Sequence, residues 1–193
     1  MIVHLDHESP AGNEDPEPAS TAEEPPERTQ PGRGLIVDLV TSGGLRAEPD
    51  VSARAWLVDH VQLVASRLEV AGELRVRLVG DVEMAAAHER HLGNPTTTDV
   101  MTFDLADGAA ARGEPVDADL LVCVDEAARV ADEHGHQIER ELLLYIVHGL
   151  LHCLGYDDHD EAAYAQMHAL EDELLTSVGV GATFTRRVGE RGS

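Results

Sequence analysis

Two histidines spaced four residues apart carry the strongest chemical signal in this 193-residue chain. His148 and His152 stand in an apolar stretch with helical periodicity, so both imidazoles project from one helix face and can bind one metal ion. Gly155 follows where the helix must end, because glycine permits the left-handed backbone that reverses the chain. The side chains that return beneath the rings are those of Asp157, Asp158 and His159. Two histidines and one returning ligand leave coordination positions open, which is typical of a catalytic zinc site.

The residue after the first histidine narrows the reaction that such a site could catalyse. Zinc peptidases carry His-Glu-x-x-His, in which the glutamate is the general base. Gly149 occupies that position here and can accept no proton, so peptidase chemistry of this type is disfavoured. A phosphodiester substrate fits better, because its non-bridging oxygens bind the ion while the metal lowers the pKa of water.

Alternating periodicities predict the elements that position this motif. Strands are expected at residues 35–40, 73–79, 98–105 and 120–124, and helices at 51–70, 81–91, from 125 onward, 137–154 and 161–176. A Gly/Ala-rich loop is expected at 106–116. The order predicts an α+β fold with one mixed sheet of about four strands, helices packed mainly on one face, and a zincin-like metal helix. His168 falls at a polar phase of the last helix, so it is expected at the surface and not at the metal.

The two ends of the chain differ in composition from its middle. Residues 1–33 are acidic, rich in proline and poor in aliphatic side chains, so they are predicted to form a disordered tail. Residues 34–178 are expected to form the folded domain, and 179–193 a short C-terminal tail. The formal net charge of −23 argues against sequence-independent coating of nucleic acid, although a metal or a local basic groove can still supply positive charge.

Compartment is predicted from the cysteines and from the absence of targeting features. Cys123 and Cys153 lie in apolar stretches and form no Cys-x-x-Cys pair, which favours buried free thiols in a reducing compartment. The N-terminus lacks the basic and apolar regions of a secretory signal, and no apolar run is long enough to span a bilayer. We expect a cytoplasmic protein that does not bind membranes.

The segment from His148 to Asp157 resembles the signature of the YbeY endoribonucleases, His-Gly-x-Leu-His-x-x-Gly-Tyr-Asp-His. Three further segments are similar to motifs of that family and stand in the same order: Thr98–Phe103, Ala118–Asp125 and Glu139–Leu142. The resemblance covers most of residues 35–176. It implies a zinc-dependent, single-strand-specific endoribonuclease that matures the 3′ end of 16S rRNA in the cytoplasm. It also implies one Zn²⁺ per chain, RNA and the small ribosomal subunit with its proteins as partners, and no small-molecule cofactor.

The resemblance leaves the third metal ligand open between two neighbouring residues. The family places a histidine ten residues after the first one, and Asp158 occupies that position here. His159 follows directly and is slightly favoured by the ligand preference of zinc. Asp157, or whichever of the pair does not bind the metal, is expected to help deprotonate the attacking water.

Contacts to RNA are predicted at three further places. The family usually carries a phosphate-binding arginine shortly before Thr-Asp-Val, but Leu92 occupies that position, with Arg90 two residues away as the substitute. Thr98 and Asp99 are expected to line the cleft, the alternative being that Asp99 caps a turn. The best basic pair for RNA phosphates, which is otherwise a solvated strand face, consists of Arg75 and Arg77.

A second hypothesis belongs to another functional class. The acidic composition and the loss of the family arginine also fit a ribosome-assembly factor that binds small-subunit components and has little or no nuclease activity. Complementary charge would speed its association with a basic ribosomal protein. A metallohydrolase for some other substrate is a third reading, which detectable peptidase turnover would favour.

Overall fold

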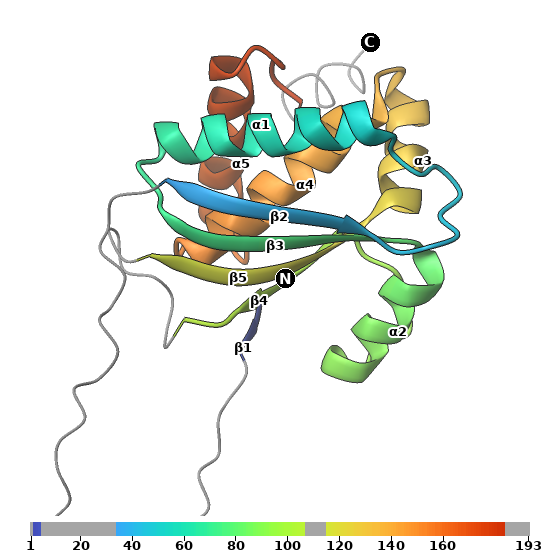
Figure 1. Ribbon diagram of the computed structural model, residues 1–193. Coiled ribbons are helices and arrows are strands. Elements are labelled where there is room, and N and C mark those ends of the chain that lie inside the picture. Colours follow the sequence, from blue (N-terminus) through green and yellow to red (C-terminus); the bar gives the residue numbers. More distant parts are fainter. Residues whose placement is uncertain (1, 5–33, 107–114, 184–193) are drawn as a thin grey trace, which may run out of the picture.

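The computed structural model describes residues 2–4, 34–106 and 115–183 (Figure 1). Except for residues 2–4, the predicted acidic tail lies outside the described residues, and so do the chain beyond residue 183 and most of the loop expected at 106–116. Residues 179–183, assigned to the C-terminal tail, pack onto the domain instead. Thr183 is buried, and its backbone N–H donates to Asp172 Oδ1 over 2.6 Å.

Five strands of the described chain form one mixed sheet in the order β1-β4-β5-β3-β2. They are β1 (Ile2–His4), β2 (Leu35–Thr41), β3 (Gly72–Val79), β4 (Val100–Asp104) and β5 (Val116–Cys123). β2, β3 and β5 are parallel, β4 is antiparallel to β5, and β1 pairs in parallel with β4. The predicted mixed sheet is confirmed. Disorder was predicted for the whole of residues 1–33, but residues 2–4 form β1. Three residues carry no periodic pattern, and they become a strand only by pairing with the edge of β4.

The helices match the predicted segments to within a few residues. They are α1 (Val51–Arg67), α2 (Asp81–Leu92), α3 (Val124–His134), α4 (Ile138–Cys153) and α5 (Glu161–Ser177). Local signals place their ends: the side chain of Asp50 caps the start of α1, and Gly93 ends α2 in the left-handed conformation. None of the helices in the described part of the chain combines the length and the apolar character that crossing a bilayer requires.

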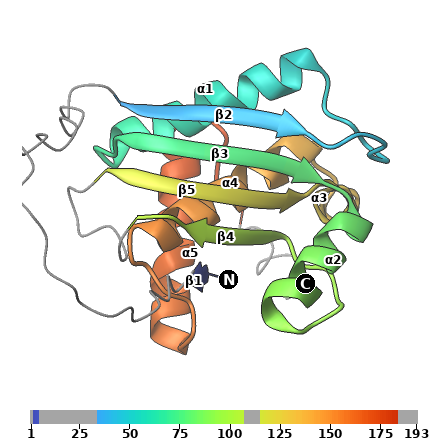
Figure 2. The ribbon, with the colours of Figure 1, turned by 60° about the horizontal axis from the view of Figure 1, so that its bottom comes forward.

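The sheet has two faces, and the helices lie against both of them (Figures 1 and 2). Successive side chains of a strand point to opposite faces. Leu74 and Leu120 are buried in the main core, which α1 and α4 form with one face. Met101 and Phe103 point to the opposite face, where Met84 of α2 packs against them. The helices therefore lie mainly on one face, as predicted, with α2 as the exception.

Helix α4 is buried along almost its whole length, because strands pack on one side of it and α1, α3 and α5 on the others. It approaches the sheet closely at Gly149. A Cβ atom at this position would lie 2.8 Å from Leu120 Cδ2 and 3.0 Å from Thr102 Oγ1. Any larger residue would therefore crowd its neighbours where α4 crosses β4 and β5, one residue after His148.

Candidate metal centre

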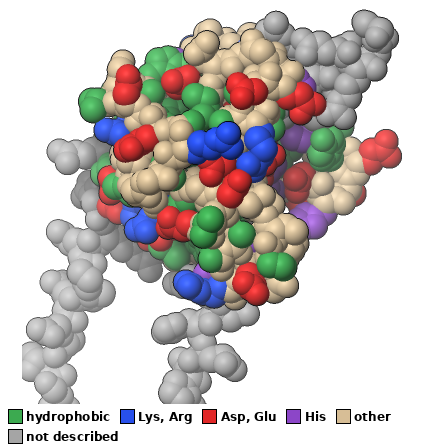
Figure 3. All heavy atoms as spheres, turned by 90° about the vertical axis from the view of Figure 1, so that its right-hand side faces the viewer, with side chains coloured by type: hydrophobic (Ala, Val, Ile, Leu, Met, Phe, Trp, Pro, Cys, Tyr) green, Lys and Arg blue, Asp and Glu red, His purple; other side chains and the backbone are tan. Residues whose placement is uncertain are grey.

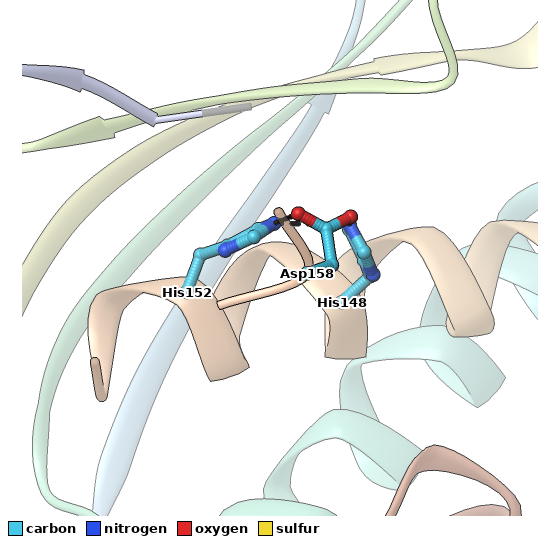
Figure 4. Close-up of side chains that lie close together, drawn as sticks. All are labelled: His148, His152 and Asp158. Carbon is cyan, nitrogen blue, oxygen red and sulfur yellow. Dashed lines mark hydrogen bonds and ion pairs between the residues drawn. The ribbon is translucent and has the colours of Figure 1, made fainter. Parts of the chain in front are cut away.

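His148 and His152 project from the last two turns of α4, and the chain that follows brings Asp158 beside them (Figure 4). The two Nε2 atoms are 3.0 Å apart. Asp158 Oδ2 lies 3.8 Å from His148 Nε2, and Asp158 Oδ1 lies 3.9 Å from His152 Nε2. One ligand atom from each of the three residues thus falls within 4.8 Å of the others, a separation that a single bound cation can bridge.

The turn after α4 has the conformation that its glycine predicts. Gly155 has a φ of 82°, in the left-handed region, and its N–H donates to the carbonyl oxygen of His152 over 2.9 Å. Tyr156 N–H donates to Leu151 O over 3.1 Å. These bonds satisfy the last carbonyls of α4 and reverse the chain, so that Asp158 returns to the histidine face.

The partners of the two Nδ1 atoms determine which way the histidine lone pairs point. His152 Nδ1 donates to the carbonyl oxygen of Tyr156 over 3.0 Å, and His148 Nδ1 donates to Glu171 Oε1 over 2.7 Å. With both protons on Nδ1, the two Nε2 atoms carry lone pairs that face each other and the Asp158 carboxylate. Such a set of electron-pair donors, each oriented by a second hydrogen bond, fits a divalent cation such as Zn²⁺.

The charge states of the site agree with metal binding. Burial, together with the neighbouring His148, lowers the pKa of His152 to about 4, so its imidazole is neutral near pH 7 and able to bind metal. Burial by itself would raise the pKa of Glu171, but the hydrogen bonds from His148 and His168 outweigh it. The net pKa of Glu171 lies below its ordinary value, so the buried carboxylate is ionised.

The structure separates the two candidates for the third ligand. The side chain of His159 is 80% exposed, and its Nδ1 donates to Asp157 Oδ1. That hydrogen bond is the main reason why the pKa of His159 is raised and that of Asp157 is lowered. Asp157 Oδ1 also accepts the N–H of Asp158 over 2.7 Å, which holds the loop. Asp158 therefore lies at the histidine pair, while Asp157 and His159 form a neighbouring exposed pair.

The structure does not bring Arg75 and Arg77 to the histidines. Both lie on the face of β3 opposite the one that packs against α4, where they line a groove of about 560 Å³. Arg75 is engaged by acids there, with Nε 2.5 Å from Asp119 Oδ1 and Nη2 2.5 Å from Asp117 Oδ1. Arg77 lies 3.6 Å from Glu83 Oε1. The predicted phosphate-binding pair is thus largely neutralised by neighbouring carboxylates and remote from the metal ligands.

The other residues that were assigned to RNA lie outside the ligand triad. Arg90 is exposed in the last turn of α2, on the face of the sheet opposite α4. Thr98 Oγ donates to Asp99 Oδ1 over 2.9 Å, and the same oxygen accepts the N–H of Val100 over 2.8 Å. The Asp99 carboxylate is thus engaged by its two chain neighbours just before β4. The residue of this segment that approaches α4 is Thr102, which is fully buried beside Gly149.

Two residues of the site were missed by the sequence reasoning. Glu171 is fully buried, and its Oε2 lies 2.5 Å from His168 Nδ1 while its Oε1 binds His148. His168, expected at the surface, has a side chain only 15% exposed. The sequence contained a pattern that could have predicted the burial of Glu171. This residue lies in helical phase with Met167, Leu174 and Leu175, so it is a carboxylate in the apolar stripe of α5.

The fold and the site define the structural class of this protein. It is an α+β domain in which a buried helix presents two histidines and the loop after that helix adds a carboxylate. The family described as Endoribonuclease YbeY matches residues 47–179. An endoribonuclease YbeY of Thermobifida fusca is 36% identical over 146 residues, covering 73% of this chain and 92% of the relative. One of Micrococcus luteus is 34% identical over 150 residues, covering 75% and 92%. The chain belongs to the YbeY endoribonuclease family.

A solved structure supports the fold independently. The solution structure of TM1509 from Thermotoga maritima matches with a TM-score of 0.51 and 20% identity, covering 74% of this chain and 91% of that one. The α+β architecture predicted from the sequence is confirmed.

Proposed function

We propose that this protein is a zinc-dependent endoribonuclease that cleaves single-stranded RNA during maturation of the 3′ end of 16S rRNA. The observation that carries the proposal is the triad of His148, His152 and Asp158, which converges in a chain belonging to a family of endoribonucleases. Asp158 is 31% exposed, so the triad is reached from solvent and a substrate phosphate has access to it.

The mechanism assigns a role to each side chain of the site. His148, His152 and Asp158 would hold Zn²⁺. When bound, the ion would act as a Lewis acid toward the phosphate and lower the pKa of water. His159 Nε2 is the proposed acceptor of the proton from the attacking water, because Nδ1 of the same ring donates to Asp157 and leaves Nε2 as the basic atom. The Asp157 carboxylate, whose pKa this contact lowers, stabilises the imidazolium that results.

Removal of the histidines tests the proposal directly. His148→Ala and His152→Ala should each abolish stoichiometric zinc, measured by elemental analysis, and cleavage of a single-stranded rRNA fragment. His91→Ala is the matched control, since His91 is exposed on α2, on the other side of the sheet, and contacts the ring of Phe103. RNA cleavage that persists in a metal-free histidine variant would refute the mechanism.

A second function, assembly of the small ribosomal subunit, is favoured by the charge distribution. The chain carries a formal net charge of −23, and several arginines of the described surface are paired with acids, as Arg129 is with Asp81 and Glu126. Figure 3 shows acidic side chains spread over one face, with arginines lying among them. Such a surface complements a basic ribosomal protein. Protein that co-sediments with small subunits but cuts no RNA at any zinc concentration would favour this function over the nuclease.

The cytoplasm is the proposed compartment for either function. Cys123 and Cys153 are both buried and unpaired. Burial raises the pKa of each thiol to about 12, which makes both unreactive. Unpaired cysteines fit a reducing compartment, where the ribosomal partners are found.

A further inference from the structure

Glu171 joins two histidines that come from different helices. Its carboxylate has one oxygen for each ring: Oε1 lies 2.7 Å from His148 Nδ1 on α4, and Oε2 lies 2.5 Å from His168 Nδ1 on α5. The two imidazoles lie nearly parallel, with centroids 6.2 Å apart and an interplanar angle of 19°. The rings of Tyr164 and His168 meet at an interplanar angle of 76°, with centroids 4.2 Å apart. The carboxylate is therefore held from both sides.

The bridge determines the tautomer of His148. A carboxylate can only accept hydrogen bonds when it is ionised, so His148 must carry its proton on Nδ1 and present the Nε2 lone pair to His152 and Asp158. His168 binds the second oxygen of Glu171, which satisfies an otherwise buried charge and prevents the carboxylate from rotating away. Glu171 is fully buried, so water cannot take over either contact.

We infer that Glu171 and His168 are positioning residues of the metal centre: Glu171 orients His148 for metal binding, and His168 fixes Glu171. The inference deepens the proposed function and rests on its metal site. Loss of a hydrogen-bond partner that orients a metal-binding histidine typically weakens metal binding about 10- to 100-fold.

The first experiment compares Glu171→Gln with Glu173→Gln, a matched change on an exposed position of the same helix. Zn²⁺ affinity is measured by competition with a chromogenic chelator, and folding of the metal-free proteins by circular dichroism. An amide offers one acceptor and one donor, so it cannot accept from both rings, and one of them must change tautomer. Glu171→Gln should lose about 10- to 100-fold in Zn²⁺ affinity, whereas Glu173→Gln should match the wild type.

A second measurement requires no metal. In the metal-free protein with ¹⁵N-labelled histidine, long-range ¹H–¹⁵N spectra report which ring nitrogen of His148 carries the proton. The wild type should show His148 protonated on Nδ1, and Glu171→Gln should reduce that population. A role for Glu171 in packing alone would change the melting temperature without changing the tautomer.

The pair His168→Ala and His168→Asn tests the outer contact, and it also serves if Glu171→Gln fails to fold. His168→Ala should lose under about tenfold in Zn²⁺ affinity. Asn can place its amide nitrogen where Nδ1 lies, so His168→Asn should restore most of that loss. In the Glu171→Gln background, His168→Ala should weaken binding little further, because His168 acts through the same carboxylate.

The measurements distinguish a failure of the roles given to Glu171 and His168 from a failure of the proposed metal centre. Unchanged affinity and tautomer in Glu171→Gln would overturn this inference while leaving the metal centre intact. Equal affinity of His168→Ala and the wild type would overturn the part assigned to His168. A wild-type protein that binds no Zn²⁺ would overturn the proposed metal centre, and the inference with it.

Discussion

Gly149 offers the sharpest test of how α4 is fixed against the sheet. A Cβ atom there would lie 2.8 and 3.1 Å from the two δ-methyl carbons of Leu120 and 3.0 Å from Thr102 Oγ1. Carbon atoms pack at about 3.5–4.0 Å, so these approaches are strongly repulsive. Leu120 and Thr102 are themselves buried in the sheet, so their side chains must shift within a packed core to make room.

The expected effect follows from two opposing terms. Alanine in place of glycine inside a helix normally stabilises by up to about 1 kcal/mol. Overpacking of a tight core typically costs about 1–3 kcal/mol. We expect Gly149→Ala to lower the free energy of unfolding by about 1 kcal/mol, equivalent to roughly 2–4 °C in melting temperature for a chain of this size. Gly149→Val, which adds two further methyl groups, should lose more.

Urea denaturation of the metal-free proteins, followed by circular dichroism, measures this difference. Gly43→Ala is the control, because a Cβ atom at that position meets nothing within 4 Å. It should leave the free energy of unfolding within about 0.5 kcal/mol of wild type. If Gly149→Ala were more stable than the wild type by the full helix-propensity gain, close packing of α4 on β4 and β5 would not be the reason for this glycine.

Two further predictions concern the metal ligands. Asp158→Ala should weaken Zn²⁺ binding by more than about 100-fold, a larger loss than that expected for residues that only orient a ligand. His159→Ala should keep wild-type affinity and lose RNA cleavage. The reverse pattern in a chelator competition assay would make His159 the ligand. The pKa of His152 is depressed to about 4 in the folded protein, so between about pH 6.5 and pH 4 the unfolded chain binds more protons and the metal-free protein becomes less stable as pH falls. His152→Ala should flatten this part of the stability profile in urea titrations, and an unchanged slope would contradict the assignment.

The elements of this protein could be predicted because their signals are local. The helical spacing around His148 and His152, the glycine at 155 that takes a positive φ, and Gly93 at the end of α2 each act within one or two turns of chain. The strands at β3 and β5 alternate or run apolar according to how many of their faces are buried. Short-range sterics and burial therefore determined the α+β fold and the helix face that carries both histidines.

The contacts between elements could not be predicted in the same way. Residues 2–4 are too few to show the alternation of a strand, and their strand exists only through pairing with the edge of β4. Arg75 and Arg77 share a strand face, as expected, but only the sheet order places Asp117 and Asp119 of β5 beside Arg75. A basic pair in the sequence thus became part of an ion-pair cluster in the fold.

Some features of the candidate metal centre could likewise be predicted from the sequence, and others could not. The sequence alone determined that two imidazoles share a helix face and that a glycine turn returns the chain toward them. Only the tertiary structure decided that Asp158 faces the histidines while His159 points to solvent, and that Glu171 of α5 orients His148. The physical reason is distance along the chain: helix spacing and turn sterics act over a few residues, whereas the direction of a loop side chain and the partner of a buried carboxylate are set by packing between helices.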